Sequence, residues 1–254
     1  MTGGVADTGI DDSTGSLFLV NPDGGPACAR LPDGTVAHCT QCDTWQQDCP
    51  RGEKCMPWAN DGGSSWNATR CSEIVRDPGG VGDPCTAQGS GVGGLDDCEL
   101  GAMCFHVDPE TNEGTCVEMC SGPSQDPICS AGSRCSITGR GVLNLCLSTC
   151  NPWLGDCDDG QVCVPNSADF SCVAQVADPV PIGDACRIIN ECVAGATCID
   201  GSGSEFRSCC SPYCDLADSD PNAPCAAGQV CTAWFDAPHE APPGFDSLGV
   251  CTVQ

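Results

Sequence analysis

The chain has 254 residues, of which 27 are cysteine and only 43 are Leu, Ile, Val or Phe, and its formal net charge at pH 7 is −26. So few large apolar side chains cannot build a large conventional core, and cysteine cross-links are what separate this composition from that of a disordered chain. The acidic excess repels phosphate backbones, which excludes nucleic acid as a partner. With one lysine and no stretch of 18 apolar residues, we expect neither a polybasic membrane contact nor a transmembrane segment.

Cysteine usage predicts the compartment. A reducing cytosol would leave the thiols open, so we expect a secreted or outer-surface protein. Residues 1–16 are rich in Gly, Ser, Thr and Asp and predict a flexible leader rather than an export signal. We expect a removed signal ahead of Met1. Because such a tether also follows the acylated cysteine of bacterial lipoproteins, an upstream lipid anchor is a further expectation.

One short phrase, Cys-x-x-Gly-x-x-Cys, occurs six times along the chain. Its copies are Cys49–Cys55, Cys98–Cys104, Cys129–Cys135, Cys157–Cys163, Cys192–Cys198 and Cys225–Cys231. Each copy has one cysteine before it and one after it, which gives the four-cysteine units Cys42–Cys71, Cys85–Cys116, Cys120–Cys146, Cys150–Cys172, Cys186–Cys210 and Cys214–Cys251. The chain is therefore predicted to be a tandem repeat.

The glycine midway through each phrase predicts a local structure. Glycine tolerates a positive φ, so we expect each phrase to be a stapled hairpin of two short strands, continued by residues such as Phe105, Val164 and Ile199. With 32 Gly, 20 Pro and no sustained 3.6-residue apolar period, little helix is expected. The predicted fold class is a small disulfide-rich protein of short β-hairpins and irregular loops, with its tandem repeats in an elongated arrangement.

A longer repeat divides the chain into three arrays. The segment 75–85 matches 176–186 position for position, and a shortened version precedes Cys28. We therefore place cysteine-rich arrays at 17–74, 75–175 and 176–254, after the leader.

All but one of the cysteines can be assigned to pairs within units. Six complete units and a remnant formed by Cys28 and Cys39 leave one cysteine over, either Cys209 or Cys210, and it is expected to be a free thiol, an intermolecular bridge or an exchange partner. Four cysteines allow three pairings, among which we favour first-to-third and second-to-fourth. By the chain-entropy model, closing a loop of about 15 residues contributes about 3 kcal/mol.

The spacing Gly-Asp-x-Cys186-x5-Cys192-x2-Gly195-x2-Cys198 resembles the N-terminal cysteine-rich region of Dickkopf proteins and the EB modules of nematode extracellular proteins. The likeness covers most of residues 85–251, at cysteine and glycine positions only. Chains with many such units and acidic leaders are also similar to secreted or surface lipoproteins of myxobacteria. The resemblance implies an extracellular, non-enzymatic interaction module and assigns no functional residue.

Catalytic signals are weak. The histidines His38, His106 and His239 fall in different arrays without a motif, and we expect surface positions for them rather than a role as a catalytic base. We therefore expect no enzyme and no cofactor. Thiolate metal sites are disfavoured because Cys39-Thr-Gln-Cys42 is the one Cys-x2-Cys pair.

One group of three residues is a candidate calcium site. Asp218, Asp220 and Asn222 alternate as oxygen ligands at the start of a calcium loop do, but the glycine and the closing glutamate of such a loop are missing. A solvated turn is the competing interpretation, with weak calcium binding as the alternative.

Aromatic residues provide a candidate partner surface. Trp58 and Trp66 lie in the loop that closes the first array, and Trp234, Phe235 and Phe245 lie in the loop that closes the third. Aromatics on cross-linked loops form pre-ordered contact surfaces, although these rings can equally fill the small cores of their own units.

Together these features predict an extracellular, non-enzymatic interaction or structural protein whose partner is an extracellular protein or a surface glycan. The alternatives are a thiol-redox or metal-binding protein, for which the reactive-thiol candidates are Cys209 and Cys210, and a self-associating subunit of a fibre or layer.

Overall fold

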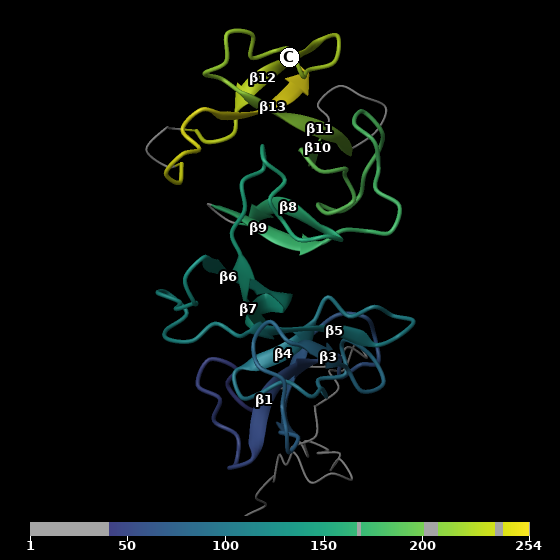
Figure 1. Ribbon diagram of the computed structural model, residues 1–254, viewed down its shortest axis with the longest axis vertical. Coiled ribbons are helices and arrows are strands. Elements are labelled where there is room, and N and C mark those ends of the chain that lie inside the picture. The colour runs from purple at the N-terminus through teal and green to yellow at the C-terminus, as the bar shows by residue number, and fades with distance from the viewer. Residues whose placement is uncertain (1–40, 167–168, 201–207, 237–240, 254) are drawn as a thin grey trace, which may run out of the picture.

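The computed structural model describes residues 41–166, 169–200, 208–236 and 241–253, which form thirteen β-strands and one 3-10 turn. The strands make five small antiparallel sheets, which are stacked along the long axis from β1 at one end to β12 and β13 at the other (Figure 1). This confirms the predicted fold class. No helix among the described residues is long and apolar enough to cross a membrane.

The sheets follow the chain in order. In the order of their strands they are β1-β2, β3-β5-β4, β6-β7, β8-β9 and β10-β11-β13-β12. The elements are β1 (Glu53–Trp58), β2 (Ala68–Glu73), β3 (Pro84–Thr86), β4 (Ala102–Phe105), β5 (Glu113–Glu118), β6 (Ser133–Thr138), η1 (Gly139–Gly141), β7 (Leu143–Ser148), β8 (Gln161–Asn166), β9 (Asp169–Ala174), β10 (Ala196–Asp200), β11 (Ser208–Asp215), β12 (Gln229–Ala233) and β13 (Leu248–Val253).

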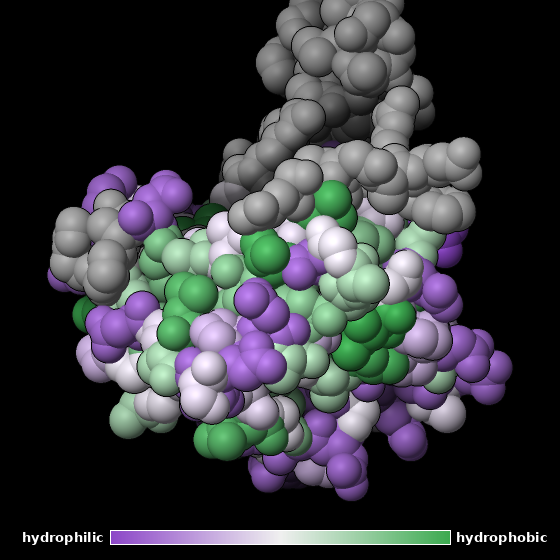
Figure 2. All heavy atoms as spheres, turned by 90° about the horizontal axis from the view of Figure 1, so that it is seen from above, coloured by the Kyte–Doolittle hydropathy of each residue, from purple (hydrophilic) through white to green (hydrophobic). Residues whose placement is uncertain are grey.

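Exposed apolar side chains are dispersed over the described surface. The most exposed large ones include Leu154, Ile128 and Leu100, which belong to different units. Seen from the C-terminal end, hydrophobic side chains form separate groups among hydrophilic ones (Figure 2). The end of the stack therefore does not present one continuous apolar face.

Disulfides cross every hairpin in the same way. In each unit the third and fourth cysteines lie directly opposite each other on paired strands, as Cys55 and Cys71 do, but they do not bond to each other. The third bonds to the first and the fourth to the second, which confirms the favoured connectivity. The twelve bonds are 42–55, 49–71, 85–104, 98–116, 120–135, 129–146, 150–163, 157–172, 186–198, 192–210, 214–231 and 225–251.

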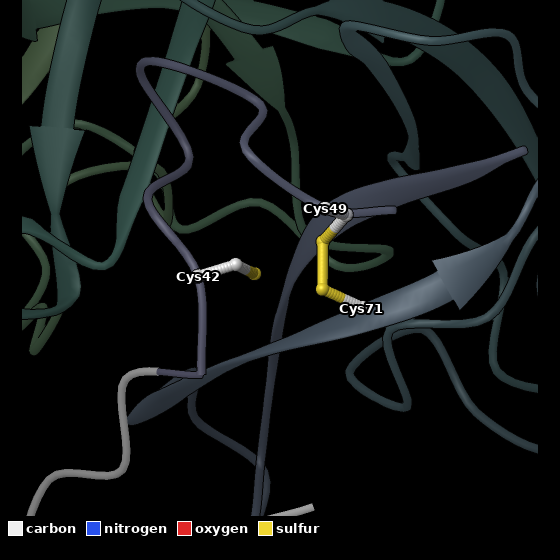
Figure 3. Close-up of side chains that lie close together, drawn as sticks. All are labelled: Cys42, Cys49 and Cys71. Carbon is white, nitrogen blue, oxygen red and sulfur yellow. A yellow bond between two sulfur atoms is a disulfide. The ribbon is translucent and has the colours of Figure 1, made fainter. Parts of the chain in front are cut away.

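The two bonds of a unit lie side by side. In the first unit the Sγ atoms of Cys42, Cys49 and Cys71 are within 4.8 Å of one another, and the Cys42 sulfur points toward the Cys49–Cys71 bond (Figure 3). Sulfur clusters recur in the other units, but their members are disulfide-bonded and so are not thiolate ligands. Disulfides in this number persist in oxidising compartments, which supports a location outside the reducing cytosol.

The glycine of each phrase has a positive φ, between 78° and 92°, but the predicted hairpin within the phrase is wrong. In the first unit the amide of Glu53 donates to the carbonyl of Pro50 at 3.0 Å, which puts Gly52 at the third position of a tight turn leading into β1. A type II turn requires positive φ there. A Cβ on Gly52 would meet nothing within 4 Å, so backbone conformation rather than space selects glycine. In each unit the hairpin is formed instead by the strand that carries the third cysteine and the strand that carries the fourth.

The matching segments at 75–85 and 176–186 fold alike. The amide of Gly82 donates to the carbonyl of Cys116, and that of Gly183 to the carbonyl of Cys210, both at 2.8 Å. Both glycines have a φ of 91°. In both segments, therefore, the matching glycine binds through its amide to the hairpin strand that carries the fourth cysteine of the unit.

The core is divided among four clusters. Two are built mainly from the cysteines of single units, 85–116 and 186–210. The other two join predicted arrays. One packs Met56 against Met103, Met119 and Leu145, and the other packs Phe170 of β9 with rings from the third array. The arrays therefore share buried surfaces.

Candidate functional site

The predicted aromatic residues lie in two separate places. Trp234, Phe235 and Phe245 all pack against the cluster around Phe170, and the rings of Trp234 and Phe170 have centroids 5.9 Å apart. Trp66 packs against the methionine and leucine cluster instead. The structure thus brings the third-array rings together on a buried ring of the second array, and places Trp66 in another cluster.

Trp58 is set apart from these clusters. Its ring lies under the guanidinium of Arg70, 5.1 Å from the centroid, which is a cation–π geometry. Its Cβ also lies 2.8 Å from where a Cβ on Gly94 would be, so a side chain at Gly94 would collide with the start of the Trp58 side chain.

The three calcium candidates are exposed, and the side-chain oxygens of Asp218 and Asn222 accept hydrogen bonds from backbone amides. The Asn222 Oδ1 accepts from the amide of Cys231 at 2.8 Å, and the Asp218 Oδ1 accepts from the amide of Asp220 at 3.3 Å. Calcium binding at these residues stays a prediction.

The surplus cysteine is Cys209. Cys210 is bonded to Cys192, whereas Cys209 is half-buried on β11 and is the one cysteine of the described residues outside a disulfide. The predicted remnant pair, Cys28 and Cys39, lies outside the described residues, as do His38 and His239.

A pocket of about 280 Å³ lies where the three predicted arrays meet. Its aromatic wall consists of Trp66, Phe105 and His106, with the ring centroids of Trp66 and Phe105 5.9 Å apart and those of Phe105 and His106 4.6 Å apart. Val92, Val107 and Val173 supply an aliphatic wall, and Ala174 and Asn190 complete the rim toward the third array. Aliphatic and aromatic linings with a few polar groups are typical of ligand sites.

His106 is the ionisable side chain on the pocket wall. The expected surface position is wrong for this histidine, because its ring is half-buried against Phe105. Burial lowers the pKa of His106, since an imidazolium loses hydration there. Its backbone φ is 54°, a left-handed conformation that is uncommon for a residue other than glycine and that turns the chain after β4. The wall is therefore uncharged at neutral pH.

Three contacts hold the pocket walls in place. The amide of Ala59 donates to the carbonyl of Val92 at 2.8 Å, which ties the first array to the aliphatic wall. On the other side the Asn190 Nδ2 donates to the carbonyl of Ala174 at 2.7 Å. Beneath the pocket, Cys104 donates its amide to the Asp96 Oδ2 at 2.7 Å.

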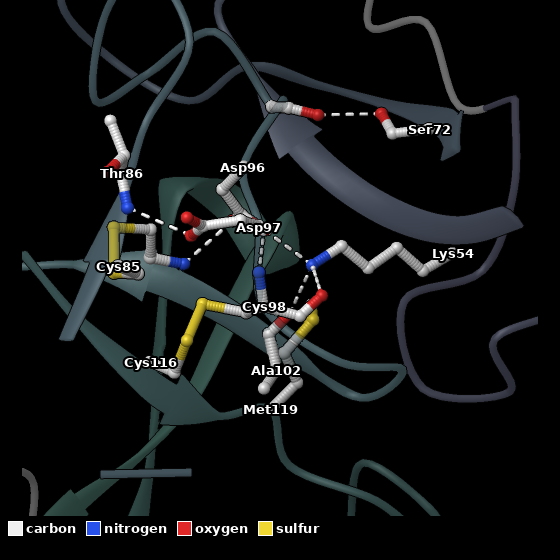
Figure 4. A network of polar contacts seen from close by, with 12 residues as sticks. Lys54, Ser72, Cys85, Thr86, Asp96, Asp97, Cys98, Ala102, Cys116 and Met119 are labelled. Atoms are coloured by element: carbon white, nitrogen blue, oxygen red, sulfur yellow. Dashed lines mark hydrogen bonds and ion pairs between the residues drawn. A yellow bond between two sulfur atoms is a disulfide. The ribbon is translucent and has the colours of Figure 1, made fainter. Parts of the chain in front are cut away.

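Asp96 belongs to a buried ion pair that crosses from the first array to the second. The Lys54 Nζ contacts the Asp96 Oδ1 at 2.5 Å and the carbonyls of Cys98 and Ala102 at 2.7 and 3.0 Å, and both side chains are almost completely buried (Figure 4). An ammonium has three donors, and here each has an acceptor. Burial lowers the pKa of Lys54, while Asp96 acts in the opposite direction.

A larger hollow of about 690 Å³ lies between β6 and the segment after β12, beside the ion pair of Arg134 with Asp169. The Arg134 side chain is 64% exposed, so water screens this ion pair, and the hollow lacks the aromatic wall of the smaller pocket. The smaller aromatic pocket is the better candidate site.

Sequence analysis identified Trp66 but missed the rest of the pocket. Val92 and Val173 come from loops and strands far apart in sequence, so no spacing connects them with Phe105. The Phe105-His106 pair directly after the second phrase was the one local signal. Comparison of the chain with protein-family models, curated proteins and solved structures found no match to any of them. The resemblance to Dickkopf and EB units stays a prediction.

Proposed function

We propose that the protein is an extracytoplasmic, non-enzymatic binding protein that presents an aromatic pocket on a disulfide-bonded stack. The observation that carries the proposal is the pocket itself, whose walls come from all three predicted arrays. Because disulfides and buried contacts fix these walls before binding, a ligand group entering the pocket meets little ordering cost.

The chemistry of the lining favours contact over catalysis. Its side chains are rings and aliphatic groups, the sulfur of Cys104 is in a disulfide, and His106 is its ionisable side chain. A hydrolytic site requires a nucleophile next to a base, and this set supplies a base candidate alone. Recognition of an extracellular protein or of a surface glycan suits the lining better than a reaction does.

Site-specific photo-crosslinking on intact source cells and in their medium tests the proposal. A benzophenone side chain at Val107, on the pocket wall, is expected to give a discrete adduct, whereas the same group at Ala233, exposed at the end of β12, is expected to give none. Filling the pocket with Ala174→Leu is expected to remove the Val107 adduct. Equal labelling from both positions, or no adduct from Val107, would overturn the binding proposal.

A further inference from the structure

The strongest feature beyond this function is the contrast between the pocket and its surroundings. The pocket lining is apolar, but carboxylates follow lining residues closely in the sequence. Asp108 directly follows Val107 of the wall, and Glu110 lies two residues further along the same exposed turn. Asp61 lies two residues after Ala59, whose amide bonds to Val92 of the same aliphatic wall.

Hydrogen bonds hold the carboxylate of Asp108. The Asp108 Oδ1 accepts the amides of Glu110 and Thr111 at 2.7 and 3.1 Å, and these bonds lower the pKa of Asp108, which therefore stays ionised at neutral pH. The basic group nearest in sequence to the pocket residue Asn190 is Arg187, whose guanidinium is paired with Glu191 at 3.3 Å. Arg70, four residues after Trp66, lies over the Trp58 ring. The exposed turn after Val107 therefore carries carboxylates, in a chain whose formal net charge is −26.

The size of the pocket limits what can enter it. Sites for drug-sized molecules typically measure about 300–1,000 Å³, so a pocket of about 280 Å³ accepts a single ring or branched side chain rather than a larger compound. Stacked or edge-on contact with Trp66 and Phe105 is the geometry that aromatic groups prefer.

We infer that the pocket receives one aromatic side chain of a cationic protein segment, with basic residues on both sides of that side chain facing the surrounding carboxylates. This inference rests on the proposed binding function and adds the chemistry of the partner. A second copy of this chain is disfavoured as the occupant, because each copy carries a formal charge of −26 and the copies repel one another.

Three short peptides test the inference on the oxidised protein. Ac-Arg-Phe-Arg-NH2 is the probe, Ac-Arg-Ala-Arg-NH2 lacks the ring, and Ac-Glu-Phe-Glu-NH2 reverses the charge. By calorimetry we expect the probe to bind roughly tenfold more tightly than either control, a difference of about 1.4 kcal/mol, because each control loses either the ring or the positive charges. The indole N–H resonance of Trp66, assigned with Trp66→Phe, should shift with the probe.

Two further measurements locate the binding. Ala174→Leu fills the pocket and should abolish the shift, while Ala233→Leu, at an exposed strand end, should leave it unchanged. Raising the salt from about 0.1 M to about 1 M shortens the screening length from about 10 Å to about 3 Å and should weaken the probe toward the affinity of an uncharged peptide.

Each other outcome overturns the inference. Equal binding of the alanine control means that charge alone attracts the peptide, and equal binding of the glutamate control means that the carboxylates have no role. If no peptide binds, the cationic segment is not the occupant. The same holds if the Trp66 resonance shifts when the protein alone is diluted, because a second copy of the chain then occupies the pocket. A pocket-dependent crosslink on cells would in either case leave the general binding function standing, so the two failures are distinguishable.

Discussion

The junction between the first and second arrays differs in kind from the junction between the second and third. The first is built from aliphatic and thioether side chains around Met56 and Leu145, together with the buried ion pair of Lys54 and Asp96. The second is built from rings. The centroid of the Phe170 ring lies within 6 Å of the ring centroids of Tyr213, Trp234 and Phe245. The disulfides, in contrast, are the same in every unit. Covalent bonds therefore define the units, while side chains particular to each position define how the units stack.

The aromatic junction should show the largest single effect. Phe170→Ala removes a ring that is fully buried between strands of two arrays, and we expect a loss of about 3–5 kcal/mol in the free energy of unfolding, from lost burial and the cavity left behind. Denaturant titration of the oxidised protein, followed by tryptophan fluorescence, measures it. A loss below about 1 kcal/mol would show that the junction is not a continuous core.

At the ion-pair junction, Lys54→Met leaves the Asp96 carboxylate buried without its cation. We expect a loss of about 3 kcal/mol, at the low end for breaking a buried pair, because the amides of Cys98 and Cys104 still bind the carboxylate. The matched control is Arg76→Met, which removes an exposed cation and should change stability by less than about 0.5 kcal/mol. Similar effects of the two substitutions would contradict the assignment of Lys54 as a buried link between arrays.

Within a unit the effects should be smaller and alike. Gly160→Ala and Gly228→Ala each force an alanine to a positive φ, and each should lower the free energy of unfolding by about 1–2 kcal/mol. Gly160→Asn should cost less, because asparagine tolerates this conformation. Costs that differ widely between the second and third arrays would argue against equivalent turns.

The smallest effect is a pH dependence at the pocket, between the two junctions. Because burial lowers the pKa of His106 in the folded protein, the unfolded chain binds this proton more readily, and stability falls as the pH drops below about 6.5. The difference in unfolding free energy between the wild type and His106→Asn isolates this group, since other titrations cancel and asparagine accepts the positive φ. A difference that does not vary with pH would show that His106 is solvated.

Local structure was largely predictable from the sequence. The positive φ of Gly52 and its equivalents and the strands that continue each phrase follow from short-range spacing, whereas the crossed disulfides were the favoured one of three pairings that the spacing allows. The error lay in which strands pair. The phrase suggested a hairpin around Gly52, whereas β1 pairs with β2, which carries Cys71. A type II turn splays the strands on either side of it, because its twist does not match that of paired strands.

The pocket was much less predictable. Trp66 was recognised as aromatic and as a candidate for contact, but nothing near it in sequence indicates Val92, His106 or Val173. The single lysine was visible in the sequence, and its place inside the first phrase gave no indication that its ammonium would reach Asp96 in the next array.

By itself the sequence determined the repeat, the cross-linked character of the units and the acidic charge, because these depend on composition and on spacings of a few residues. Only the tertiary structure decided that Cys209 rather than Cys210 is free, how neighbouring arrays share buried side chains, and where the aromatic pocket lies. The last two features join residues far apart in the sequence: the Lys54 ammonium bonds to Asp96, and Trp66 lines the same pocket as Val173. Periodicity within one unit carries no information about which side chains of the next unit will face it.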